Sequence, residues 1–114
     1  VEAKELFKIK YFTKAILIFE KLIKQKYKPA QCNFYLGEIW FKRKKFKDAI
    51  YYFKESMMLY DKAKYIPILL LHSAISFQQL NDLDNAKKFY TTLIDIYPNS
   101  KEAKQAEDKL AKIK

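Results

Sequence analysis

A small residue followed four positions later by an aromatic residue recurs along this chain at nearly constant spacing. The three copies are shifted by 34 and then 37 residues, and their members are Ala15 with Phe19, Ala49 with Phe53, and Ala86 with Tyr90. An apolar residue precedes each alanine by three positions, at Phe12, Phe46 and Leu83. Self-similarity at such a period is typical of a chain that stacks one supersecondary unit several times. The fold must therefore be built from repeats that share a continuous core.

A second set of small residues predicts what that unit is. Twelve positions before each alanine lies another small residue: Ala3, Gly37 and Ala74. Helices approach closely only where side chains are minimal, so small residues at matched places in two successive helical segments indicate an antiparallel pair in contact there. The repeated unit is therefore predicted to be a helical hairpin.

Hydrophobic periodicity and helix-end signals predict an all-α chain. Apolar residues spaced at about 3.6 positions mark helices over residues 1–9, 13–26, 30–43, 46–60, 65–79, 83–96 and 100–113. Pro29 and Pro67 suit first helical turns, whereas Pro98 ends a helix, and Asn99 or Ser100 can cap the next one. The connections are short throughout.

These residues resemble the tetratricopeptide consensus. The resemblance rests on Leu36-Gly37-x-x-Trp40, on Ala49-x-x-x-Phe53, and on Ala86-x-x-x-Tyr90 followed by Pro98. It implies a solenoid of about three antiparallel helix hairpins, the first truncated, plus a C-terminal capping helix. As one domain over 1–114, the repeats would span 1–29, 30–63 and 64–98, with the cap at 99–114. The chain departs from the consensus at Asn33, at Asp61, and at Lys44 or Lys45, where a turn glycine is common.

A narrower resemblance is to the C-terminal repeat domain of the YbgF family, also called CpoB. It rests on Phe34-Tyr35-Leu36-Gly37-Glu38, Pro67-x-x-Leu70-Leu71, Phe77-Gln78-Gln79-Leu80-x-Asp82-x-Asp84-x-Ala86, and Tyr97-Pro98-x-Ser100-x-x-Ala103. The resemblance implies a periplasmic scaffold of the Tol-Pal system that binds TolA and coordinates peptidoglycan synthesis with outer-membrane constriction in cell division. That family trimerises through an upstream coiled coil, so a homo-oligomer formed by a segment outside this chain stays open. The outer-membrane assembly protein BamD and other bacterial repeat adaptors share the Tyr97-Pro98-x-Ser100 pattern and form the alternative.

Charge leaves a second alternative open. The formal net charge is +10, from 23 basic against 13 acidic residues, and the excess lies toward the N-terminus. The run Lys42-Arg43-Lys44-Lys45-Phe46-Lys47 spans a predicted turn. It is either a solvated loop or the basis of an adaptor for nucleic acid or anionic membrane. Nucleic acid is disfavoured because no base-reading geometry is evident.

The residue inventory argues against catalysis. His72 is the only histidine, Cys32 the only cysteine and Gly37 the only glycine. Metal sites built on several His or Cys ligands, Cys-His nucleophilic pairs and glycine-rich phosphate loops therefore lack their components. We expect no enzyme activity, metal, cofactor or small-molecule substrate. The start has no signal-peptide pattern and opens partway through a helical pattern, so we expect a fragment or processed product.

Stacked hairpins predict a concave groove lined by the first helix of each pair. Side chains one, four and five positions after each small residue should face it, with the residues three positions before Gly37 and Ala74 at its border. The predicted groove residues are Lys4, Phe7, Lys8, Phe34, Glu38, Phe41, Lys42, Leu71, Ile75, Gln78 and Gln79. Exposed aromatic residues there could anchor a protein segment, Phe41 and Phe34 first; alternatively, Phe7, Phe34 and Phe41 belong to the core between repeats. Carboxylate capture is disfavoured because Lys4, Glu38 or Ile75, never Asn, follows the small residue.

Overall fold

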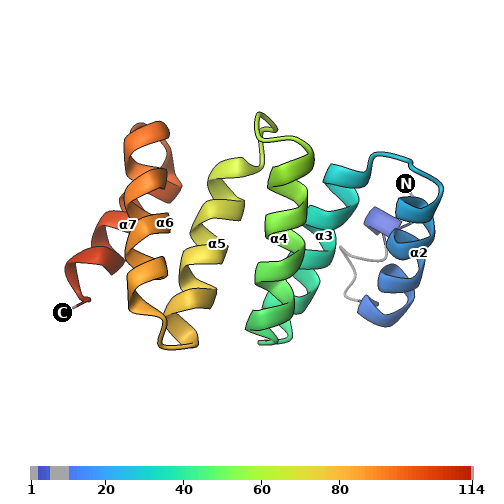
Figure 1. The fold of residues 1–114 in the computed structure, drawn as a ribbon, viewed down its shortest axis with the longest axis horizontal. Coiled ribbons are helices and arrows are strands. Elements are labelled where there is room, and N and C mark those ends of the chain that lie inside the picture. The colour runs from blue at the N-terminus through green and yellow to red at the C-terminus, as the bar shows by residue number, and fades with distance from the viewer. Residues whose placement is uncertain (1–2, 6–10, 114) are drawn as a thin grey trace. The chain divides into compact units, whose positions relative to one another are not determined.

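The computed structural model describes residues 3–5 and 11–113, and every regular element in these ranges is helical. The helices are α2 (Phe12–Lys24), α3 (Pro29–Lys42), α4 (Phe46–Leu59), α5 (Ile66–Gln79), α6 (Leu83–Ile96) and α7 (Lys101–Ala111) (Figure 1). Each end agrees with its predicted position within one residue, except that α2 ends at Lys24 and α7 at Ala111, two residues before the predicted ends at 26 and 113. Of the predicted first helix, residues 3–5 are helical and the remainder lies outside the described residues.

The chain forms two compact units, Val1–Asp61 and Lys62–Lys114. Unit 1 contains α2, α3 and α4, and unit 2 contains α5, α6 and α7. Within each unit, consecutive helices run antiparallel and are joined by short turns (Figure 1). The predicted single domain and its repeat boundaries stay predictions.

The core of unit 1 forms around the small residues that the repeat pattern singled out. Ala3, Ala15 and Ala49 are buried. Ala3 and Ala15 lie in one cluster with Phe19, Cys32, Leu36 and Ile39. The Phe19 ring stacks on that of Tyr35, with ring centroids 5.4 Å apart, and so joins α2 to α3. Small residues thus mark the places where helices of this unit approach each other.

Gly37 is the point of closest approach between α3 and α4. A Cβ atom placed on Gly37 would lie 2.5 Å from two ring carbons of Phe53, which is fully buried. The Ser56 hydroxyl, in the last turn of α4, donates a hydrogen bond of 2.7 Å to the backbone carbonyl of Ala30, in the first turn of α3. Glycine is therefore required at position 37 for contact with a neighbouring ring, since the residue lies inside a regular helix.

Unit 2 repeats this construction and adds a third helix. Ala74 on α5 and Ala86 and Tyr90 on α6 are fully buried. The Tyr90 hydroxyl donates a hydrogen bond of 2.7 Å to the Gln78 side-chain carbonyl, joining the two helices. Helix α7 packs on both and buries Ala103 and Ala106, in agreement with the predicted capping helix.

The N-terminal ends of the helices differ in whether a side chain caps them. The side chains of Asp82 and Ser100 accept hydrogen bonds from the third residue after them and so cap α6 and α7. Lys45, before α4, and Tyr11, before α2, make no side-chain cap bond. The turn residue Lys44 has φ of 62°, the left-handed conformation that glycine adopts without strain.

Candidate functional site

Two predicted groove residues of α3 are buried within unit 1. Phe34 is 6% exposed and packs against the rings of Tyr35 and Phe53, with centroids 5.4 and 6.2 Å away. Glu38 is 7% exposed and has an interaction partner. The prediction of Phe34 as an exposed aromatic anchor is therefore corrected: α3 lies between α2 and α4, and both neighbours cover its middle turns. The core alternative holds for this residue.

Accessible members of the predicted groove in unit 1 lie toward the end of α3. Phe41 is partly exposed and meets the Phe46 ring edge-to-face at 5.9 Å, and the next residue, Lys42, is exposed. Lys4 is partly buried, with its ammonium 5.6 Å from the centroid of the Tyr35 ring. Phe7 and Lys8 lie outside the described residues.

In unit 2 the predicted groove residues occupy the second half of α5. Leu71 is 4% exposed and belongs to the core. Ile75 is partly exposed, and Gln79 is exposed. Gln78 is engaged by Tyr90, so its carbonyl oxygen already accepts one hydrogen bond. The accessible members of this set, Ile75, Gln78 and Gln79, carry no charge.

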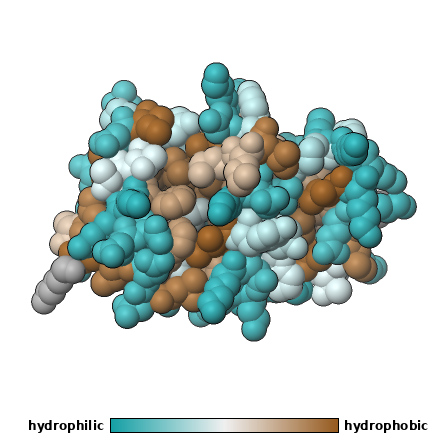
Figure 2. Space-filling model, viewed as in Figure 1, coloured by the Kyte–Doolittle hydropathy of each residue, from teal (hydrophilic) through white to brown (hydrophobic). Residues whose placement is uncertain are grey.

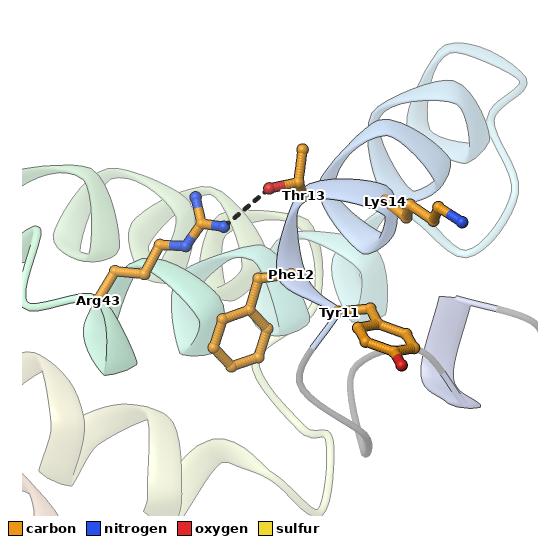
Figure 3. Close-up of a pocket in the computed structure, with 5 residues that line it drawn as sticks. All are labelled: Tyr11, Phe12, Thr13, Lys14 and Arg43. Atoms are coloured by element: carbon orange, nitrogen blue, oxygen red, sulfur yellow. Dashed lines mark hydrogen bonds between the residues drawn. The ribbon is translucent and has the colours of Figure 1, made fainter.

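Arg43, at the end of α3, organises a cluster that the sequence analysis did not identify. Its guanidinium donates a hydrogen bond of 3.1 Å to the Thr13 hydroxyl (Figure 3). It also lies 5.7 Å from the centroid of the Phe12 ring and 5.5 Å from that of Trp40. Two rings and a hydroxyl thus contact one cation. The signal in the sequence was a basic residue three positions after Trp40, where a helix places side chains side by side.

An open depression of about 340 Å³ adjoins this cluster. It is lined by Tyr11 just before α2, by the first three residues of α2, and by Arg43, namely Tyr11, Phe12, Thr13, Lys14 and Arg43 (Figure 3). Tyr11 is 60% exposed. Two of these five residues are aromatic and three are basic or carry an aliphatic hydroxyl, with no carboxylate among the residues that the structure describes there.

Exposed apolar side chains also occur in unit 1 away from this depression. Met58, Leu59 and Tyr60 follow one another at the end of α4 and are each more than half exposed. On the face shown in Figure 2, hydrophobic and hydrophilic side chains alternate over short distances. On this face the hydrophobic side chains are therefore divided into small patches by hydrophilic ones.

The described ranges contain no group of three or more His, Cys, Asp and Glu side chains placed to hold a metal ion. No helix in those ranges is long and apolar enough to span a membrane. Burial raises the pKa of the Cys32 thiol, and its sulfur donates a hydrogen bond to the Tyr27 carbonyl at 3.4 Å. Such a thiol is poorly reactive because the thiolate is disfavoured.

Comparisons with known proteins agree on the fold. The family model described as tetratricopeptide repeat matches residues 69–100. The fold is that of a tetratricopeptide-repeat domain. A solved structure, the N-terminal domain of stress-induced protein-1 from C. elegans, aligns over 96% of this chain and 89% of its own length, with a TM-score of 0.78 and 20% sequence identity. No curated protein matches the sequence. Tetratricopeptide domains are in general non-catalytic modules that bind proteins.

Proposed function

We propose that this chain is a non-catalytic scaffold of the bacterial cell envelope that acts in the periplasm and binds a TolA-type protein. The observation that supports the scaffold role is the tetratricopeptide fold itself, whose repeated hairpins present accessible side chains on rigid helices. The narrower role rests on the sequence resemblance to the YbgF family, which runs from Phe34 to Ala103. In that role the protein would couple peptidoglycan synthesis to outer-membrane constriction during cell division.

Within unit 1, the end of α3 is the part of the predicted groove that a partner can reach. Phe41 is partly exposed beside the exposed Lys42, whereas Phe34 is enclosed by its neighbours. Partly buried aromatic residues of this kind commonly contribute most to protein-protein affinity. Phe41 is therefore the residue at which partner binding should be tested first.

The test is a calorimetric titration of the chain with the purified periplasmic part of TolA from the same organism. We expect saturable binding, and a loss of about 10-fold in affinity for Phe41→Ala, the size of one ordinary hot-spot residue. Lys54→Ala, at an exposed position of α4, is the matched control and should bind as the unchanged chain does. Circular dichroism confirms that each variant is folded.

Absence of binding by the folded, unchanged chain would refute the TolA assignment. Equal affinity of Phe41→Ala and Lys54→Ala would refute the role given to α3. The periplasmic assignment has its own measurement, cell fractionation with an antibody against the full gene product. Recovery of the protein in the cytoplasmic fraction would refute it.

A further inference from the structure

We infer that one end of unit 1 is a second binding surface, which takes an acidic segment of a partner protein. We call this surface the basic end and define it by the residues Lys14, Lys42, Arg43, Lys44, Lys45 and Lys47. The inference rests on the proposed scaffold function and adds to it a place and a partner chemistry. The surface is separate from the predicted groove, which it meets only at Lys42.

Charge is the first argument for an anionic partner. All six side chains are exposed, and five of them fall within six consecutive residues around the turn between α3 and α4. Within the described ranges, no ion pair joins any of them to a carboxylate, although Asp48 lies in the first turn of α4. Unit 1 as a whole has 14 basic and seven acidic residues, a net charge of +7. Such a concentration attracts and orients an approaching anion.

The second argument is that one of these cations is held ready for a carboxylate. A guanidinium has five N–H donors, and Arg43 directs one of them to Thr13. Contact with the Phe12 and Trp40 rings limits the conformations open to the Arg43 side chain, so less side-chain entropy remains to be lost on binding. Planar guanidinium groups bind carboxylates through two parallel hydrogen bonds. The adjoining depression, with Tyr11 and Phe12 in its wall, has room for an apolar side chain next to that carboxylate.

Two helix N-termini add to the positive potential of the basic end. Helices α2 and α4 begin at Phe12 and Phe46, and neither has a side-chain cap on its first N–H groups. Their dipoles contribute partial positive charge near the same cations. Helix α2 also has no acidic residue in its first turn.

An acidic peptide suits this surface better than nucleic acid does. Proteins that bind single strands combine cations with open aromatic faces on which bases stack. Here the guanidinium of Arg43 lies over Phe12 and Trp40, and of the rings in the depression only Tyr11 is largely exposed. A carboxylate next to an apolar side chain would contact both the Arg43 guanidinium and the aromatic wall of the depression. A nucleic acid would interact with the positive charge alone.

The experiment measures fluorescence anisotropy of two labelled probes, an oligoglutamate peptide that contains one leucine and an oligothymidylate of equal charge. Four proteins are compared: the unchanged chain, Arg43→Gln, the double variant Lys44→Glu with Lys47→Glu, and a control with Lys54→Glu and Lys104→Glu. The control makes the same change in net charge at exposed helix positions that are not among the residues defining the basic end. Thermal melting shows that each variant is folded.

We expect the peptide to bind more tightly than the oligonucleotide at physiological salt. The double variant should lose about 10-fold in peptide affinity, Arg43→Gln several-fold, and the control less than about 2-fold. Equal losses in the double variant and the control would overturn the inference, since net charge alone would then explain binding. Tighter binding of the oligonucleotide would overturn it in favour of nucleic acid. None of these outcomes depends on TolA, so the proposed function can fail while this inference holds, and the reverse.

Discussion

The backbone of Gly37 lies directly against the ring of Phe53, and no side chain fits between them. A Cβ at position 37 would meet two ring carbons at 2.5 Å and a third at 3.0 Å. Phe53 is fully buried, so its ring cannot turn out into solvent without leaving the core. The distance between α3 and α4 is set at this contact.

Gly37→Ala should therefore destabilise the chain, although alanine is the better helix former. Replacing glycine inside a helix gains about 1 kcal/mol, while overpacking a core costs about 1–3 kcal/mol. Contacts of 2.5 Å place the cost toward the upper end of that range, so we expect a net loss of about 1–2 kcal/mol in the free energy of unfolding, measured by urea denaturation. The same substitution in a Phe53→Leu background should cost less, because the ring is gone. An equal cost in both backgrounds would show that this contact does not limit the packing.

Burial of Tyr90 predicts a pH dependence of stability. Burial raises the pKa of Tyr90 to about 12 from its ordinary value of 10, so the folded chain holds this proton more tightly than the unfolded chain does. The resulting stabilisation is complete below about pH 10 and is lost as the pH rises toward 12. Tyr90→Phe should lower stability by about 1 kcal/mol at pH 7, since the Gln78 carbonyl loses its donor.

The measurement is urea denaturation of both proteins at pH 8 and at about pH 11. The difference in stability between unchanged chain and Tyr90→Phe should shrink, or change sign, at the higher pH. Tyr52, whose pKa burial also raises, is present in both proteins and cancels in the comparison. A difference that is the same at both pH values would contradict the assignment to Tyr90.

A missing helix cap predicts a stabilising substitution. Lys45 precedes α4 with φ and ψ of −94° and 78°, almost the values of the capping residue Asp82, which are −91° and 77°. A serine at position 45 can thus accept a hydrogen bond from the backbone N–H of Asp48, as Asp82 does from Asn85. Lys45→Ser should raise the free energy of unfolding by about 1 kcal/mol. The melting temperature measures this.

Lys47→Ser is the control for the cap, because it removes the same charge two residues later without reaching the capping position. It should leave stability nearly unchanged or slightly lower it. Lys45→Ser should also bind the oligoglutamate probe more weakly, so that stability and affinity change in opposite directions. A gain in stability equal for both variants would mean that relief of charge repulsion, not capping, is responsible.

The repeat pattern predicted the helical hairpins because small residues are needed wherever two helices pack closely together. Ala15, Ala49 and Ala86 are all fully buried, and Gly37 lies against the residue that ends the second copy of the motif. Pro98 likewise marked the end of α6, since a proline cannot continue a helix. Such constraints act locally on each residue, which is why spacing alone reveals them.

Exposure of the site residues was harder to predict because it depends on what packs from both sides. Phe34 has the spacing of a groove residue, but the rings of Tyr35 and Phe53 enclose it. The position of Arg43 depends on Thr13, 30 residues away in the sequence, and no period connects the two. The basic run is visible in the sequence, whereas the contacts of Arg43 with the Phe12 and Trp40 rings depend on the fold.

The short turn around Lys44 also bears on how quickly the chain reaches this structure. It brings Gly37 and Phe53 into contact. Because these residues are only sixteen positions apart in the sequence, little loop entropy is lost when α3 and α4 meet. Folds built from such local contacts generally form within microseconds to milliseconds. The hairpin of α3 and α4 should therefore be an early folding nucleus. It forms quickly even though the turn residue Lys44 adopts a left-handed conformation.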